Sequence, residues 1–222
     1  MVRVCLPVVA LLGAASALPL SQRAGTESLP ADAKFQLMAL RSGSEIHFAP
    51  FSAAKNSVFL DLPSQNATCA DGPEDRATFF LRDGGLYLYG DPATKQQLYA
   101  DRSGMGTFAP FISPSPCFRS LSCLTRQALI MFSHIIGQGK FGYTTGTEPP
   151  PRNAEQTGWV LDEANNLSLN GTGLIACPNS IDGAWSVWVY AGIDQPAGNS
   201  DCVGFSARAV QIDEPNSCLY TS

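Results

Sequence analysis

Charged side chains are scarce in this sequence of 222 residues, in which Lys, Arg, Asp and Glu together make up 15%. That scarcity, together with 20 Gly and 16 Pro, argues against a helical bundle and favours a turn-rich all-β domain. Only His47 and His134 supply imidazole, and neither a Cys-x-x-Cys pair nor a Gly-x-Ser-x-Gly elbow occurs. We therefore expect no metal, no cofactor and no catalytic residue, and hence no enzyme.

An excess of positive charge is also missing, since the net charge is −5 and the sequence pI is near 4.9. A protein of this sign is poorly suited to nucleic acid or to an anionic membrane surface. Apart from the apolar run at 4–15, the sequence has no long hydrophobic run, and residues 215–222 lack the apolar tail of a lipid-anchor signal. We expect no nucleic-acid partner and no membrane anchor.

The first long feature that is present lies at the N-terminus. Arg3 precedes an apolar run at 4–15, and residues 15–17 read Ala-Ser-Ala, the pattern that signal peptidase cleaves. The run is shorter than the ~20 apolar residues that cross a bilayer. We interpret 1–17 as a secretory signal peptide, with a buried N-terminal helix as the alternative, and expect the mature chain to begin near Leu18.

The remaining sequence predicts short strands between turns. Residues 18–33 show no apolar period and are expected to form a loose lead-in to a single domain at 34–222. The predicted hairpins pair 35–40 with 45–48, 78–81 with 86–89, and 158–161 with 167–169. A further apolar strand follows each hairpin. Three units of four strands predict an all-β fold, a β-trefoil-like barrel, with a β-sandwich as the alternative.

One segment breaks this repeat. The step between hairpins is 40 residues from Ile46 to Leu86 but 81 residues from Leu86 to Leu167. Residues 107–136 account for the excess, and they lack the strand alternation and turn chemistry of their flanks. We interpret them as a non-native insert, a retained intron translated in frame, and a genuine loop is the alternative.

Six cysteines remain once Cys5 leaves with the signal peptide, an even number that indicates disulfides in a secreted protein. The expected pairs are Cys177 with Cys202 and Cys69 with Cys218. The first pair would flank the aromatic strand at 185–190, and the second would tie the C-terminal tail to the first unit. The state of Cys117 and Cys123, which lie in the expected insert, is left open.

Glycosylation is indicated by three Asn-x-Ser/Thr sequons, at Asn66, Asn166 and Asn170. In a signal-bearing chain they predict a glycoprotein. Asn66 lies in a polar loop where a bulky sugar can be accommodated. Asn166 and Asn170 are close enough that a glycan on one would hinder a glycan on the other.

Several stretches identify a family resemblance. The chain resembles PhiA-type fungal cell-wall proteins, which are named for a role in phialide and conidium development. The resemblance implies a secreted, wall-associated, development-linked protein and brings no catalytic residues. The matching stretches are Arg41-Ser42-Gly43-Ser44, Pro50 to Lys55, Ser64 to Ala67, Gly85 to Tyr89, Gly142 to Gly146, Ile175 to Ser186, Pro196 to Asn199 and Pro215 to Cys218.

Individual candidate residues mostly have structural interpretations. Asp83, Asp162, Asp182 and Asp201 each lie beside turn residues, where Asp is favoured for backbone hydrogen bonding rather than catalysis. His47 is expected on an exposed strand face. Of the three tryptophans, at least two are expected in the core, and Trp188 is the candidate glycan contact if it is exposed.

Two functions follow from these observations. The first is a structural or developmental wall glycoprotein, held by non-covalent contacts with cell-wall polysaccharide or with wall glycoproteins. The alternative is a lectin-like module that binds cell-wall polysaccharide.

Overall fold

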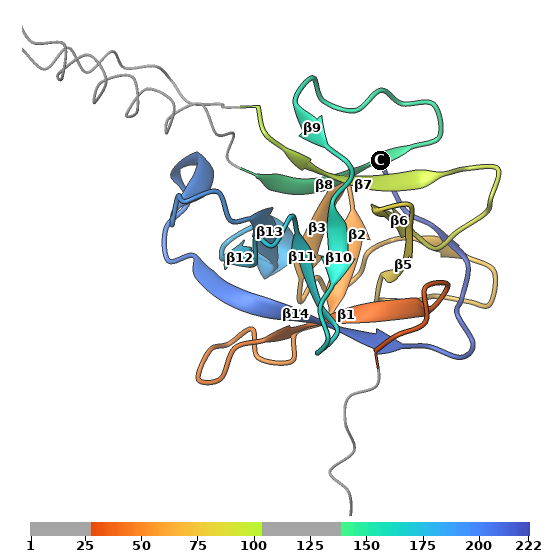
Figure 1. Cartoon of the computed structure of the whole chain (residues 1–222), viewed down its shortest axis with the longest axis horizontal. Coiled ribbons are helices and arrows are strands. Elements are labelled where there is room, and N and C mark those ends of the chain that lie inside the picture. The colour runs from red at the N-terminus through yellow and green to blue at the C-terminus, as the bar shows by residue number, and fades with distance from the viewer. Residues whose placement is uncertain (1–27, 104–138) are drawn as a thin grey trace, which may run out of the picture.

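The computed structural model describes residues 28–103 and 139–222 (Figure 1). The expected signal peptide at 1–17 and the expected insert at 107–136 lie outside the described residues, as does most of the expected lead-in at 18–33. The described chain is built of strands joined by turns. The predicted all-β class is confirmed.

Fifteen strands and two short 3₁₀ turns make up the regular structure of these two stretches. The strands are β1 (Lys34–Leu40), β2 (Phe51–Ala54), β3 (Ser57–Leu60), β4 (Thr68–Cys69), β5 (Thr78–Arg82), β6 (Gly85–Leu88), β7 (Gln96–Asp101), β8 (Lys140–Thr145), β9 (Ala154–Glu155), β10 (Trp159–Leu161), β11 (Asn166–Leu169), β12 (Leu174–Cys177), β13 (Trp185–Val189), β14 (Val203–Gln211) and β15 (Cys218–Leu219). The 3₁₀ turns are η1 (Ile181–Gly183) and η2 (Pro196–Gly198). In the described part of the chain, neither helical segment approaches the length or apolar character that crossing a membrane requires.

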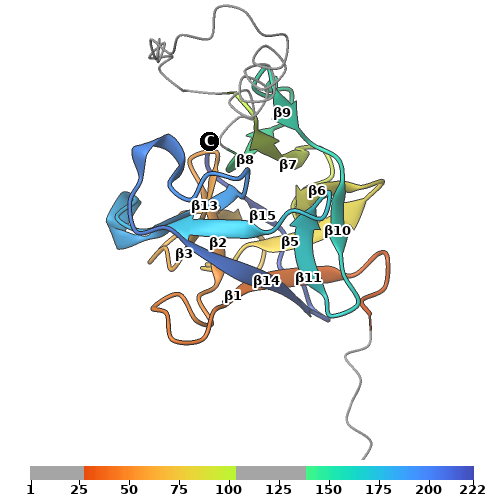
Figure 2. The same cartoon turned by 60° about the vertical axis from the view of Figure 1, so that its left-hand side comes forward.

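Thirteen strands form one large antiparallel sheet. Its path of pairing runs β1-β5-β6-β7-β8-β3-β13-β12-β14-β11-β10, and β1 also pairs with β14. The pairing therefore returns to its starting strand, and Figure 2 shows β1 and β14 side by side. Strands β4 and β15 form a separate two-stranded sheet. A trefoil-like barrel of three four-stranded units stays a prediction.

The core lies on the inner side of these strands. Along β1 the buried residues alternate with half-exposed ones, so that Phe35, Leu37 and Ala39 face inward. The Phe35 ring stacks on Phe79 of β5 with centroids 6.3 Å apart. Trp159 is also buried. Full burial of an apolar side chain such as Phe35 or Phe79 stabilises the fold by roughly 1.5–3 kcal/mol.

The hairpin of β5 and β6 agrees with the sequence prediction. Phe80 pairs with Tyr87, and the turn between the strands has positive φ at Asp83 (50°) and Gly84 (71°). Two successive positive φ angles are the signature of a type I′ hairpin turn, which Asp-Gly favours. The hairpin of β10 and β11 was also predicted correctly, because its Asn-rich turn and alternating apolar residues are local signals.

The predicted strand at 45–48 is wrong. These residues form turns, in which Phe48 has φ of 70° and its N–H donates to the Ala39 carbonyl at 2.8 Å. Ile46 is fully buried, so its apolar side chain fills the core from a loop rather than from a strand. β2 pairs with β3 in place of the predicted hairpin.

Strand β14 was missed by the sequence analysis although it is the longest strand described. It pairs with β1, β11 and β12, so it joins strands from distant parts of the chain. Its inward positions Ala207 and Ala209 are small, and the intervening positions of the other face are Gly204, Ser206 and Arg208. An apolar period built on alanine is too weak to indicate a strand from the sequence.

The C-terminal segment, residues 216–222, is anchored in the interior by Tyr220. Its phenol oxygen accepts the Thr78 N–H at 3.0 Å. The side-chain amide of Gln96 makes two hydrogen bonds with the backbone of Tyr220. Its oxygen accepts the Tyr220 N–H at 3.0 Å, and its nitrogen donates to the Tyr220 carbonyl at 2.9 Å. The Tyr143 hydroxyl donates to the carbonyl of Thr221. Buried polar groups of this segment are therefore satisfied by partners far away in the sequence.

Candidate functional site

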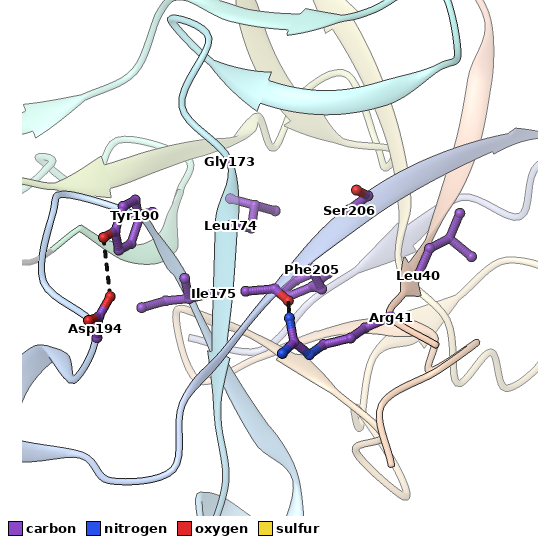
Figure 3. Close-up of a pocket in the computed structure, with 10 residues that line it drawn as sticks. Leu40, Arg41, Gly173, Leu174, Ile175, Tyr190, Asp194, Phe205 and Ser206 are labelled. Carbon is purple, nitrogen blue, oxygen red and sulfur yellow. Dashed lines mark hydrogen bonds between the residues drawn. The ribbon is translucent and has the colours of Figure 1, made fainter. Parts of the chain in front are cut away.

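A shallow pocket of about 620 Å³ lies where the end of β1 meets β12 and β14 (Figure 3). Its volume falls in the range of roughly 300–1,000 Å³ that is usual for small-molecule sites. The lining residues combine apolar side chains with an aromatic ring, a carboxylate and a guanidinium. They are Leu40, Arg41, Gly173, Leu174, Ile175, Tyr190, Asp194, Gly204, Phe205 and Ser206.

The floor of the pocket depends on Gly204. This glycine of β14 lies opposite Ile175 of β12, and a Cβ placed on it would come within 4.0 Å of the Ile175 side chain. The missing side chain leaves the hollow open. From β1, the Arg41 guanidinium reaches across and donates to the Gly204 carbonyl at 2.5 Å. The guanidinium is held at the pocket edge by this contact.

The opposite side of the pocket carries a tyrosine and a carboxylate. Tyr190 directly follows β13 and is 38% exposed, and its hydroxyl donates to Asp194 Oδ1 at 3.1 Å. This hydrogen bond and the negative charge of Asp194 raise the pKa of Tyr190 above its usual value. In Figure 3 the Tyr190–Asp194 pair and Arg41 lie on opposite sides of Ile175 and Phe205. Polar groups thus border an apolar centre.

The lining of this pocket lacks the side chains of two common hydrolytic mechanisms. Among the lining residues there is one carboxylate and neither a histidine nor a cysteine. The pocket therefore offers neither the two carboxylates of glycoside hydrolysis nor a serine or cysteine beside a histidine. An apolar centre with a few polar groups at its edge can accept a ligand that has both kinds of face, such as a sugar ring.

Trp188 does not provide the exposed surface that the sequence suggested. Only 8% of it is exposed, although it lies opposite Ile175 in the pairing of β12 with β13. Trp188 and Ile175 pack with Cys177 and Cys202 into one cluster, and the indole N–H donates to Ser186 Oγ at 3.0 Å. The condition of exposure is therefore not met, because the disulfide region covers the ring, and Trp159 and Trp188 are both buried, as expected for at least two of the three tryptophans.

The acidic candidates serve turns. Asp162 Oδ1 accepts the N–H groups of Asn166 at 2.8 Å and Ala164 at 2.9 Å, and the hydrogen bonds from Asn166 hold the pKa of Asp162 below its usual value. His47 Nδ1 accepts the Arg41 N–H at 3.2 Å. In residues 28–103 and 139–222, no three His, Cys, Asp or Glu side chains are placed to hold a metal. Positive φ angles of turn residues occur at Asp83 (50°), Asp182 (50°) and Asp201 (57°).

Two disulfides are present in the structure. They join Cys69 to Cys218, 149 residues apart, and Cys177 to Cys202, 25 residues apart. The first links the paired strands β4 and β15, and the second connects the end of β12 to the residue before β14. Cys117 and Cys123 lie outside the described residues.

The three sequons differ in what their side chains do. Asn66 is exposed, and its amide nitrogen, to which a glycan would be attached, donates no hydrogen bond within the described chain. Asn166 Nδ2 donates to Asp162 Oδ2 at 3.0 Å, and Asn170 Nδ2 donates to Glu155 Oε1 at 2.5 Å. Asn66 is therefore the sequon best placed to carry a glycan on the folded domain.

The pocket residues were not singled out by the sequence analysis. Tyr190 was expected only as part of the aromatic strand at 185–190. The one local signal is that Tyr190 ends the aromatic strand at 185–190 and is followed four residues later by Asp194. The sequence around Arg41 does not indicate that it lines the pocket, because only the pairing of β1 with β14 brings Arg41 next to the other lining residues.

Comparisons with known proteins agree with the resemblance. The family model described as PhiA-like secreted protein matches residues 35–109 and 119–221. It omits 110–118, whereas the other residues of the expected insert, 107–109 and 119–136, lie within the match. The chain is 46% identical over 208 residues to the Cell wall protein phiA of Aspergillus fumigatus, covering 94% of this chain and 95% of the relative. It is 43% identical over 208 residues to the protein of the same name from Aspergillus niger, covering 94% and 93%. It is 32% identical over 204 residues to that of Arthroderma benhamiae, covering 88% and 91%.

No solved structure matches the chain. The family match extends over both described stretches of the domain, and the relatives cover most of the sequence. The chain therefore belongs to the PhiA-like secreted proteins and is a secreted protein of the cell wall.

Proposed function

We propose that the protein is a structural glycoprotein of the fungal cell wall that acts in phialide and conidium formation. The observation that carries this proposal is the similarity of nearly the whole chain to relatives named cell wall protein phiA. A non-catalytic role is supported by the placement of Asp162 and His47 in turn hydrogen bonds. The anchored C-terminal segment suits a protein that persists in the wall.

Complementation tests this role directly. The chain would be expressed in an Aspergillus fumigatus strain that lacks its own cell wall protein phiA, and conidia and phialides would be counted. We expect the full chain to restore both counts, and a version without residues 1–17 to restore neither. The developmental role is contradicted if the full chain reaches the wall and the counts stay at the level of the empty strain.

A lectin-like module is the second candidate. It is favoured by the pocket between Arg41 and Tyr190, whose apolar centre and polar edge match a sugar ring. The candidate assumes a trefoil-like barrel, and the return of strand pairing from β14 to β1 is compatible with that assumption. Binding to neutral wall polysaccharide would then occur at the pocket floor.

Co-sedimentation with insoluble chitin and β-glucan tests the lectin candidate. Gly204→Val would fill the pocket beside Ile175 and should reduce the bound fraction. Gln211→Val places a valine at an exposed position at the end of β14, outside the pocket, and should not reduce the bound fraction. Equal binding of the two variants and the unaltered protein would remove the pocket from consideration.

A glycan at Asn66 is part of the proposal. Mass analysis of the Asn66 peptide before and after glycosidase treatment should reveal a loss of mass. The matched variants Asn66→Gln and Asn166→Gln separate this sequon from the one in which the amide is engaged with Asp162. An unchanged mass of the Asn66 peptide contradicts the prediction.

We further propose that residues 107–136 are an insert that the fold does not need. Asp101 pairs with Lys140, and the Gly139 N–H donates to the Asp101 carbonyl at 2.9 Å, so the two ends of the connection are neighbours. Joining Gly106 to Gln138 should leave the β7–β8 pairing intact and raise secreted yield and melting temperature. Lower stability of the shortened protein would mean that the segment belongs to the fold.

A further inference from the structure

Neighbouring strands present a row of side chains on the outer face of the β5–β6 hairpin. Lys34 of β1 lies opposite Phe80 of β5, and Phe80 lies opposite Tyr87 of β6. The rings of Phe80 and Tyr87 stack with centroids 5.3 Å apart. The adjacent residues Phe79 and Leu86 are fully buried, so the alternation of the strands directs the row outward.

Three cations lie over these two rings. Lys34 Nζ is 5.3 Å from the centroid of Phe80, and Arg82 Cζ is 5.4 Å from the same centroid. Lys95 Nζ is 4.7 Å from the centroid of Tyr87. Contacts of this kind contribute ~0.5–1 kcal/mol at exposed sites, enough to orient a long side chain. We call Lys34, Phe80, Arg82, Tyr87 and Lys95 the cation–aromatic row.

The cation–aromatic row lines a pocket of about 380 Å³ that lies apart from the pocket between Arg41 and Tyr190. Tyr89 adds a third half-buried ring. Two carboxylates, Asp83 and Asp91, also line it. Asp83 belongs to the hairpin turn, and Asp91 Oδ1 accepts the Ala93 N–H at 2.9 Å. Neither carboxylate pairs with a cation of the row.

The absence of carboxylate partners for the cations is the decisive observation. Among the described residues the only ion pair joins Arg102 to Glu155, at 2.8 Å. Three of the ten basic side chains in that part of the chain belong to the row. The whole protein carries 14 basic and 19 acidic residues, so acidic partners are plentiful elsewhere. Asp83 and Asp91 lie in the same pocket, but neither forms an ion pair with Lys34, Arg82 or Lys95, so the three cations keep their capacity to bind an oxyanion directly.

A packing role alone does not account for this arrangement. One cation over each ring would suffice for packing, whereas Lys34 and Arg82 are both held over Phe80. Arg82 and Lys95 are exposed beside the partly exposed rings, and the half-exposed Lys34 keeps two of its three N–H donors beyond the hydrogen bond of 2.6 Å that it donates to the Asp32 carbonyl. A guanidinium binds carboxylate or phosphate through two parallel hydrogen bonds, and an ammonium adds a point charge. Aromatic faces at the same place accept the apolar face of a sugar ring.

We propose that this pocket binds a saccharide that carries an oxyanion, a carboxylate or a phosphate. The cations would contact the oxyanion and the rings would contact the sugar. This ligand class rests on the location of the protein in the cell wall, where glycans surround it. It does not depend on the proposed developmental role. Nucleic acid also carries oxyanions and ring systems that stack on aromatic side chains, but the net charge of −5 of the protein opposes binding of a densely charged polyanion.

Calorimetric titration of the secreted full-length protein tests the proposal. The probes are trigalacturonic acid for the carboxylate, mannose 6-phosphate for the phosphate, neutral cellotriose, inorganic phosphate and a single-stranded oligothymidylate. We expect one acidic saccharide to bind about tenfold or more tightly than cellotriose, a difference that charge-assisted hydrogen bonds can supply. Binding should weaken as salt concentration rises.

Two triple variants separate the pocket from overall charge. Lys34→Gln, Arg82→Gln and Lys95→Gln together should reduce the affinity about tenfold or more. The control with Lys55→Gln, Arg76→Gln and Lys140→Gln removes the same charge at exposed positions outside the pocket and should leave the affinity unchanged.

A second measurement needs no variant. Acetylation of the unaltered protein should be slowed by the acidic saccharide at Lys34 and Lys95, and not at Lys55 or Lys140. The proposal is overturned if cellotriose binds as tightly as both acids, if inorganic phosphate binds as tightly as mannose 6-phosphate, or if oligothymidylate binds more tightly than either sugar. Equal loss in both triple variants, or equal protection of all four lysines, would overturn it as well. None of these outcomes depends on the complementation result.

Discussion

Two segments of the molecule are each tied down by one disulfide, yet their polar contacts differ. The C-terminal segment, residues 216–222, places Tyr220 in the interior, where its hydroxyl and backbone meet Thr78 and Gln96. The connection from Tyr190 to Cys202 keeps its hydrogen-bonded pair, Tyr190 with Asp194, at the surface.

The difference separates stability from ligand access. A buried polar group that loses its partner keeps the full cost of its desolvation, whereas an exposed one is hydrated again by water. The C-terminal segment therefore strengthens the fold, and the Tyr190 connection leaves a phenol and a carboxylate beside an open pocket. Each change below should weaken the first segment more than the second.

The largest difference should come from the disulfides. Replacing Cys69 and Cys218 by Ala frees a loop of 149 residues, which corresponds to ~5 kcal/mol of unfolding free energy in the chain-entropy model. Replacing Cys177 and Cys202 frees 25 residues and corresponds to ~3.5 kcal/mol. Denaturant unfolding of both double variants measures the gap. A more destabilised Cys177 and Cys202 variant would reverse the comparison.

The Gln96 amide should have the next largest effect. Gln96→Leu leaves the N–H and carbonyl of Tyr220 buried without partners, at a cost of about 1–3 kcal/mol for each group. Gln97→Leu makes the same change at the next, half-exposed position and should have little effect. Unfolding midpoints in urea compare the two. Equal midpoints would mean that water replaces the lost hydrogen bonds.

Alkaline pH should weaken the interior anchor. Burial raises the pKa of Tyr220 to about 12 and also raises the pKa of Tyr143. Because the unfolded chain releases these protons near pH ~10, stability is complete below that pH and falls as pH rises toward about 12. Unfolding free energy measured from pH 8 to pH 12 should decline less in Tyr220→Phe. An identical decline in this variant would contradict the assignment.

The smallest effect is expected at the exposed tyrosine. Tyr190→Phe removes the hydrogen bond to Asp194 at the surface and should leave the melting temperature unchanged. Tyr220→Phe removes the acceptor of the buried Thr78 N–H and should cost about 1–3 kcal/mol. Thermal unfolding followed by circular dichroism compares the two. A clear loss of melting temperature in Tyr190→Phe would show that the surface connection also stabilises the fold.

Local signals account for what was predicted correctly about the fold. The hairpin of β5 and β6 was predicted because Asp83 and Gly84 specify its turn, and the inward and outward residues of its strands alternate. The strand at 45–48 was wrong for the converse reason. Its residues alternate in the same way, but the core accepts Ile46 from a turn, and nothing in the local sequence distinguishes the two outcomes.

The surface sites required the assembled sheet. Trp188 was the candidate glycan contact on the condition that it is exposed, but the Cys177–Cys202 region covers it. Lys34 is the first residue of the expected domain, directly after the lead-in at 18–33, and nothing in its sequence neighbourhood indicates a binding residue. Its place beside Phe80 follows from the pairing of β1 with β5. Contacts between residues that are distant in the sequence leave no local sequence pattern. Neither pocket could therefore be predicted from the sequence.

By itself, the sequence determined the all-β class and, through the family, the compartment, because turn chemistry and long stretches shared with secreted cell-wall proteins are written in consecutive residues. Tertiary structure alone decided which side chains meet. It brought Arg41 to Gly204 and gathered the unpaired cations over Phe80 and Tyr87. The physical reason is that the partners of a strand are chosen by the closure of the whole sheet around one core, and that choice depends on packing among all the strands at once.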